Sequence, residues 1–118
     1  MNILVVEDNE SIREMVALVL EEEGYEVICA RDGQEALDLL AEVEPHVILL
    51  DMRMPRMDGR TFAQVYRKKL GDGVPIVVMT ASYNPAKAAQ DTQAAAYLAK
   101  PFEVDDLLGL IRQVETGQ

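Results

Sequence analysis

Five short apolar runs, separated by segments of helical periodicity, constrain the fold of this chain more than any other feature of its sequence. Four of the runs show no alternation with polar residues, which indicates strands covered on both faces. The intervening segments carry apolar residues at helical spacing, and capping residues such as Asp32 and Asn84 begin two of them. The five runs are residues 2–6, 25–30, 46–50, 75–80 and 96–99.

This alternation predicts an α/β fold, a doubly wound parallel sheet of five strands with helices on both faces. The length of 118 residues suits one hydrophobic core, so we expect a single domain over residues 1–118. Ligands of such sheets bind beyond the carboxyl ends of the strands. The five expected helices include residues 12–20, 36–40, 62–70, 85 onward and 104–111.

The composition argues against two classes of partner. Twenty-one acidic and eleven basic residues give a formal charge of −10, which disfavours direct binding of nucleic acid or an anionic membrane. No apolar stretch approaches the ~20 residues that span a bilayer, and the N-terminus turns acidic where a signal peptide would stay apolar. A cytoplasmic protein is therefore expected. The single cysteine, Cys29, lies within an apolar run and is interpreted as a small buried side chain.

Polar residues from four regions of the chain stand at the ends of predicted strands. Glu7 and Asp8 follow the first strand, Asp51 the third, Thr80 ends the fourth, and Lys100 follows the fifth. Because parallel strands end at one edge of the sheet, these side chains should meet there. Asp51 ends the most hydrophobic run, and a buried carboxylate needs a partner. We expect Lys100 and a metal held by Glu7 and Asp8 to supply it.

The charges of this cluster predict the kind of metal and the chemistry. Three carboxylates and one ammonium sum to −2, which one divalent cation would neutralise. A site made of oxygen ligands suits Mg²⁺, or Mn²⁺ in its place, better than Zn²⁺. A carboxylate beside a hard cation, an ammonium and a hydroxyl has the parts needed to accept a phosphoryl group. Asp51 would be the acceptor.

Four motifs resemble the receiver domain of two-component response regulators, in the manner of the chemotaxis regulators. They are "LVVEDN", "LLDMRMPRMDG", "IVVMTA" and "YLAKPF", and they match in order and spacing over essentially the whole chain. The resemblance implies a flavodoxin-like sheet of strand order 2-1-3-4-5 with five helices. It also implies a phosphorylation-dependent signalling switch, which accepts a phosphoryl group from a histidine kinase phosphohistidine and is not a turnover enzyme.

The resemblance assigns a role to each residue at the site. Asp51 would be the phosphoacceptor. The Mg²⁺ ligands would be Asp8, Asp51 and the backbone carbonyl of Arg53, while Glu7 would act through water. The side chain of Arg53, two residues beyond the phosphoacceptor, is expected to tune the rate of dephosphorylation.

The remaining roles fall on residues at the ends of the fourth and fifth strands. Thr80 and Lys100 would bind the phosphoryl group, and Tyr97 would change rotamer on activation. Ser82, two residues beyond Thr80, would help to tune dephosphorylation. The peptide bond before Pro101 is expected to be cis, far above the base rate of about 5%.

The sequence departs from the family pattern before Tyr97. Family members usually carry a Gly-Ala pair where this chain has Gln93-Ala94. Glycine would end the fourth helix at little cost and glutamine would not. The alanine-rich surroundings bury little apolar area, so this helix is also expected to resist movement weakly.

The implied partners are a sensor histidine kinase or a phosphotransfer protein, and a downstream effector that reads residues 84–112. The chain itself would be a monomer or a weak phosphorylation-dependent dimer.

Three other classes of function would need other sequence features or fewer of these residues. A phosphatase of the haloacid dehalogenase type would need Asp-x-Asp after the first strand, and a flavodoxin-like cofactor binder would need a Ser-, Thr- and Gly-rich first loop. A constitutive binding module would not need the set Asp51, Thr80 and Lys100.

Overall fold

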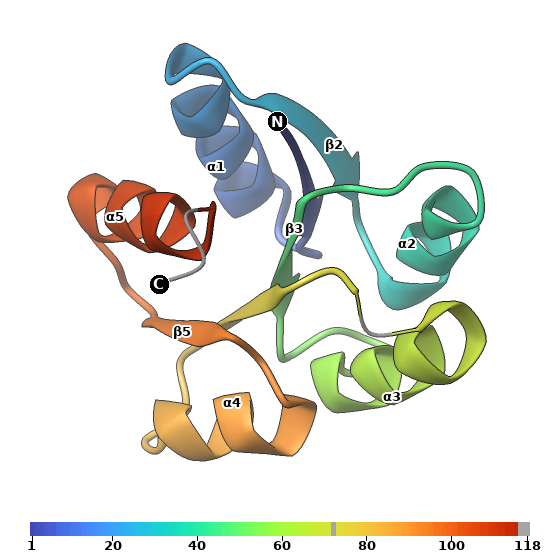
Figure 1. Ribbon diagram of the computed structural model, residues 1–118. Coiled ribbons are helices and arrows are strands. Elements are labelled where there is room, and N and C mark those ends of the chain that lie inside the picture. The colour runs from blue at the N-terminus through green and yellow to red at the C-terminus, as the bar shows by residue number, and fades with distance from the viewer. Residues whose placement is uncertain (72, 116–118) are drawn as a thin grey trace.

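A computed structural model, which describes residues 1–71 and 73–115, shows strands and helices in strict alternation (Figure 1). No helix in these two ranges is long and apolar enough to cross a membrane. The strands are β1 (Asn2–Val6), β2 (Glu26–Ala30), β3 (Val47–Asp51), β4 (Ile76–Thr80) and β5 (Ala96–Ala99). The helices are α1 (Glu10–Glu22), α2 (Gly33–Leu40), α3 (Gly59–Leu70), α4 (Pro85–Thr92) and α5 (Val104–Glu115).

The five strands form one parallel sheet in the order β2-β1-β3-β4-β5, so the predicted fold class is confirmed. The register aligns the strand ends. Val6 pairs with Leu50 and Thr80 pairs with Ala99, so the residues that follow these pairs emerge at one edge. Topology alone therefore gathers polar residues that are far apart in the sequence.

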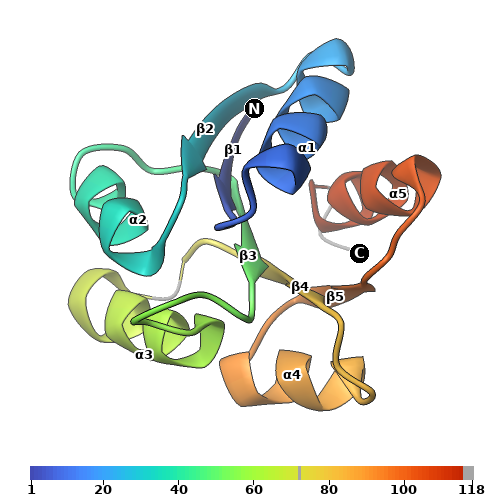
Figure 2. The same cartoon turned by 180° about the vertical axis from the view of Figure 1, so that it is seen from behind.

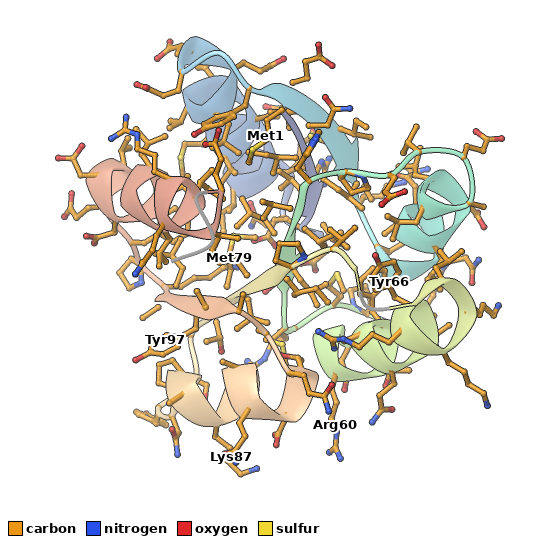
Figure 3. All side chains as sticks on the ribbon, viewed as in Figure 1. Met1, Arg60, Tyr66, Met79, Lys87 and Tyr97 are labelled. Carbon is orange, nitrogen blue, oxygen red and sulfur yellow. The ribbon has the colours of Figure 1, made fainter. Side chains whose placement is uncertain are left out.

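Helices cover both faces of the sheet (Figures 1 and 2). On one face α1 and α5 pack on a core that includes Met79, which Figure 3 shows on the side of α5. On the other face α2 and α3 pack on a second core through residues such as Phe62 and Tyr66, and Ala89 of α4 lies against that core. The central strands have core on both faces, which explains their uninterrupted apolar sequence.

The interpretation of Cys29 as a buried side chain was wrong, because Cys29 is exposed. Every residue of β3 and β4 is buried, whereas β2 lies at the edge of the sheet and contains exposed, half-buried and buried residues. Cys29 pairs with Val5 in the register but lies on this outer strand. An apolar run predicts a strand but does not distinguish an edge strand from a central one.

The helix ends follow the capping residues of the sequence. The Asp32 carboxylate accepts a hydrogen bond from the Glu35 amide at 2.8 Å, and Asn84 accepts one from the Lys87 amide at 3.2 Å.

After α1 the chain turns at Gly24, whose φ of 93° suits glycine. The corresponding residue after α4 is Gln93, with φ 54° and ψ 40°. This left-handed conformation costs a non-glycine residue roughly 1 kcal/mol or more.

Candidate functional site

A cleft of about 740 Å³ opens at the carboxyl edge of the sheet, between the ends of β1, β3 and β4 and the first turns of α1 and α4. The predicted site residues that line it come from loops or strand ends that the parallel topology brings to this edge. They are Glu7, Asp8, Asp51, Arg53, Thr80, Ser82 and Lys100.

Three of these residues form an acidic cluster. Carboxylate oxygens of Glu7, Asp8 and Asp51 lie within 4.8 Å of one another. Glu7 is fully buried, Asp51 is 4% exposed, and Asp8 is exposed. The cluster therefore has two carboxylates held inside the protein and one that faces solvent.

Lys100 bridges the two buried carboxylates. Its Nζ lies 2.6 Å from Oε1 of Glu7 and 3.2 Å from Oδ1 of Asp51. The backbone amide of Arg53 also donates to Oδ1 of Asp51 at 3.3 Å, and the amide of Asn9 donates to Oε2 of Glu7 at 3.3 Å. Both buried carboxylates thus have hydrogen-bond donors, and the shorter contact of the lysine is with Glu7.

The buried site changes the acidity of its groups. Burial first, and then the neighbouring Glu7 carboxylate, raise the pKa of Asp51 from 3.8 to about 7, although Lys100 acts in the opposite direction. Burial alone would lower the pKa of Lys100, but its hydrogen bond to Glu7 and the charge of Asp51 outweigh burial, and the pKa is raised. The cluster thus holds more negative charge than one ammonium neutralises.

The donor set fits a hard divalent cation. All three side-chain ligands offer oxygen, their formal charge with Lys100 is −2, and the exposed Asp8 leaves room for water. Mg²⁺ prefers few carboxylates together with water. The oxygen cluster is therefore chemically suited to Mg²⁺ or Mn²⁺.

The fourth strand brings a hydroxyl to the same cleft. Thr80 is 5% exposed, and its Oγ1 accepts a hydrogen bond from the Ser82 amide at 3.0 Å. The Ser82 hydroxyl oxygen in turn accepts from the Asn84 amide at 3.1 Å. Arg53 is exposed at the rim of the cleft.

Two predicted residues lie outside this cleft. Tyr97 is 45% exposed on β5, where it pairs with Val78 and lies beside α4 (Figure 3). The peptide bond between Lys100 and Pro101 is cis. Pro101 and Tyr97 line a separate shallow depression with residues of α5.

Residues 3–112 match the family of response regulator receiver domains. The chain belongs to that family. Receiver domains are the signalling switches of two-component systems, and this chain is one of them. This membership sets aside the phosphatase of the haloacid dehalogenase type and the flavodoxin-like cofactor binder considered above.

Similar proteins support the same assignment. The receiver domain is 43% identical to the response regulator MprA of Mycolicibacterium vanbaalenii over 112 residues, which are 93% of this chain and 48% of that protein. It spans about half the length of the curated relatives it matches.

Solved structures are similar over nearly the full chain. Chemotaxis protein CheY4 of Vibrio cholerae has 35% identity and a TM-score of 0.88, over 96% of this chain and 97% of that one. Response regulator TrrA of Thermotoga maritima, solved in complex with Mg²⁺ and BeF, has 34% identity and a TM-score of 0.85, with the same coverage.

Sequence reasoning missed three residues near the site of the receiver domain. Arg13 donates from its guanidinium to the backbone carbonyl of Glu7 at 2.9 Å. Lys87 and Asp91 line the far side of the cleft and form an ion pair of 3.2 Å. The sequence could have indicated Lys87, because Asn84 begins α4 at the carboxyl edge of the sheet and Lys87 lies in the first turn of that helix.

Proposed function

We propose that this receiver domain accepts a phosphoryl group on Asp51 from the phosphohistidine of a sensor histidine kinase or a phosphotransfer protein. One observation carries the proposal: an ammonium 3.2 Å away and two further carboxylates converge on this buried aspartate. Glu7 is fully buried and bound by Lys100, and Asp8 is exposed. Glu7 and Asp51 both combine burial, a cation and a position on the cleft, but Glu7 has no exposed surface and both of its carboxylate oxygens accept hydrogen bonds, whereas Asp51 is 4% exposed.

In the transfer, a carboxylate oxygen of Asp51 attacks the phosphorus of the donor. The P–N bond breaks, and its electron pair leaves with the imidazole of the donor, which takes up a proton. The negative charge that remains on the phosphoryl oxygens needs donors close by. Lys100 is in place beside Asp51, and Thr80 reaches the phosphoryl group by turning its hydroxyl from the Ser82 amide.

The acidic cluster would hold Mg²⁺ during this reaction. Asp8, Asp51 and the backbone carbonyl of Arg53 would be its ligands, with Glu7 acting through water. When bound, the cation neutralises the excess charge of the carboxylates and of the phosphoryl oxygens. TrrA, a similar receiver solved with Mg²⁺ and BeF, supports this assignment.

The cleft rim would set the lifetime of the phosphorylated state. Arg53 is exposed beside the phosphoacceptor and Ser82 lies two residues beyond Thr80. Both lie where a side chain can shield the phosphoryl group from water. We expect Arg53 to shield or pair with it, which slows autodephosphorylation.

The output surface would be formed by α4, β5 and α5. Movement of Thr80 toward the phosphoryl group leaves space into which the half-exposed ring of Tyr97 can turn. A cytoplasmic effector, or a second copy in a weak phosphorylation-dependent dimer, would read this surface. A partner that prefers the turned ring favours phosphorylation by linkage.

Intact-mass measurement after incubation with Mg²⁺ and acetyl phosphate tests the proposal. The parent and an Asp58→Asn control, which changes an exposed carboxylate of the helix α3 cap, should each gain one base-labile phosphoryl group. The Asp51→Asn variant should gain none. A base-labile phosphoryl group on that variant would show that another residue is the acceptor.

A further inference from the structure

The two ends of α4 are held very differently. The whole helix lies within the described part of the chain, and Thr92, at its last position, is its one buried residue. The first turn borders the cleft and is largely exposed. Figure 2 shows α4 below the sheet, next to α3. Burial therefore fixes the C-terminal end of α4 more firmly than its N-terminal end.

Backbone hydrogen bonds close the C-terminal end in a regular pattern. The amide of Ala94 donates to the carbonyl of Ala89 at 2.8 Å, and the amide of Gln93 donates to that of Gln90 at 3.1 Å. This is the Schellman pattern, which normally has glycine in the left-handed position, as Gly24 is after α1. Here glutamine occupies that position, so the helix end needs support from elsewhere.

That support comes from Arg67 of α3. Its guanidinium donates to the backbone carbonyl of Thr92 and, at 2.9 Å, to that of Gln93. These carbonyls lie at a helix end, where the backbone carries partial negative charge and lacks donors of its own. The positive, forked side chain of arginine supplies both donors at once. The contact joins α4 to α3 across 25 and 26 residues of sequence.

Helix α3 provides a rigid support because it is attached to the phosphoacceptor strand. The Gly59 amide donates to the carbonyl of Met52 at 3.0 Å, and a Cβ on Gly59 would lie only 2.9 Å from the Met52 Cα. Phe62 is fully buried, and its ring stacks on that of Tyr66. Arg67 therefore extends from a helix whose first residue is held against Met52, directly after the strand that ends in Asp51.

The N-terminal end of α4 is instead linked to Thr80, the residue proposed to move toward the phosphoryl group. A series of amide to side-chain hydrogen bonds runs from Ser82 to Thr80, from Asn84 to Ser82 and from Lys87 to Asn84. When the Thr80 side chain turns toward the phosphoryl group, its Oγ1 moves away from the Ser82 amide. That amide then loses its hydrogen-bond acceptor. The first turn of α4 then loses part of its attachment.

We propose that Arg67 is a positioning residue that makes the C-terminal end of α4 the fixed hinge of the switch. This inference rests on the proposed function of Asp51. Occupation of the phosphoryl site displaces residues 82–88, most of which line the cleft, and leaves residues 90–94 in place. Without the guanidinium the whole helix shifts, and the surface that a partner would contact no longer has one fixed arrangement.

Amide hydrogen exchange followed by NMR tests the hinge. In the ligand-free protein, Arg67→Gln should accelerate exchange of the Gln93 and Ala94 amides about tenfold. Lys68→Gln is the matched control, since it removes the same charge from an exposed neighbour, and it should change these amides less than twofold. Adding Gln93→Gly to Arg67→Gln should restore slow exchange, because glycine ends the helix without strain.

The second measurement adds Mg²⁺ and beryllofluoride, and it reports on more than stability. In the parent and in Lys68→Gln, chemical shifts should change over residues 82–88 and not over 90–94. In Arg67→Gln the changes should extend through 90–94. Equal effects of the two single variants, or parent changes as large at 90–94 as at 82–88, would overturn the hinge.

Failure of the hinge and failure of the proposed function are distinguishable. If beryllofluoride changes the chemical shift of no amide near Asp51 or Thr80, the proposed phosphoryl site is wrong. The ligand-free comparison of Arg67→Gln with Lys68→Gln still shows whether Arg67 anchors the C-terminal end of α4. Should Arg67→Gln not fold, Arg67→Lys takes its place. It keeps the charge but cannot bind both carbonyls with a planar fork, so we expect faster exchange at Ala94 there too. Exchange as slow as in the parent would then refute the anchor.

Discussion

Replacing Asp51 with asparagine should stabilise the metal-free protein, by an amount that grows with pH. The substitution keeps the size of the side chain. Its Oδ1 can still accept from Lys100 and from the Arg53 amide, as the carboxylate does at 3.2 and 3.3 Å. Its amide nitrogen can donate to Glu7, where the carboxylate of the parent is repelled.

The magnitude follows from the acidity of the buried group. The pKa of Asp51 is raised from 3.8 to about 7, chiefly by burial and then by Glu7. Between these values the folded protein binds more protons than the unfolded chain, so the contribution of this residue to stability is lost as pH rises. The pKa shift of about 3 units, at about 1.4 kcal/mol per unit, sets an upper limit of about 4 kcal/mol on the stability that the substitution can gain above pH 7. Because the neutral amide binds Lys100 less strongly, we expect about 2 kcal/mol.

Urea unfolding in the presence of a chelator, from pH 4 to pH 8, measures this effect. The free energies of unfolding of Asp51→Asn and the parent should be nearly equal at pH 4 and diverge steadily to about 2 kcal/mol above pH 7, which corresponds to about 8 °C in a parallel thermal melt. Asp58→Asn is the control, because asparagine caps a helix as well as aspartate does. A difference that is constant over this pH range, or of opposite sign at pH 8, would refute the reasoning.

Two further predictions concern the metal and the cleft rim. Mg²⁺ at ten times its dissociation constant should stabilise the parent by about 1.4 kcal/mol, and Asp8→Ala should abolish that thermal shift; an undiminished shift would exclude Asp8 as a ligand. Arg53→Ala should speed loss of phosphate from Asp51 about two- to threefold, a change in rate that corresponds to the free energy of an exposed ion pair. Arg56→Ala, in the same loop, should leave the rate unchanged. An unchanged rate in Arg53→Ala would contradict the shielding role.

The fold and the gathering of the site were predictable because both follow from topology. Uninterrupted apolar runs such as 47–50 and 76–79 occur where a strand has helices on both sides, and their order along the chain allows few arrangements. Once the strands are parallel, the residues after them share an edge. Glu7, Asp51 and Lys100 could therefore be placed together without any knowledge of side-chain contacts.

Contacts between side chains were less accessible. The sequence predicted that Lys100 would pair with Asp51, and it does, but its Nζ lies closer to Glu7, at 2.6 Å against 3.2 Å. That preference depends on where each carboxylate points, which strand order does not specify. The exposure of Cys29 has a similar cause, since it depends on how far the helices extend over the edge strand β2.

The end of α4 shows how a local irregularity in sequence can be resolved by a distant residue. Gln93 occupies a position that favours glycine, so the sequence indicated a costly helix end but not what would support it. Arg67 supplies the support from another helix, and its side chain has no periodicity or motif that connects it to residue 93. A glycine would have let α4 end without the support of Arg67. With glutamine, the end of α4 depends on the helix that follows the phosphoacceptor strand, so the same substitution that weakens the helix locally couples it to the part of the molecule that holds Asp51.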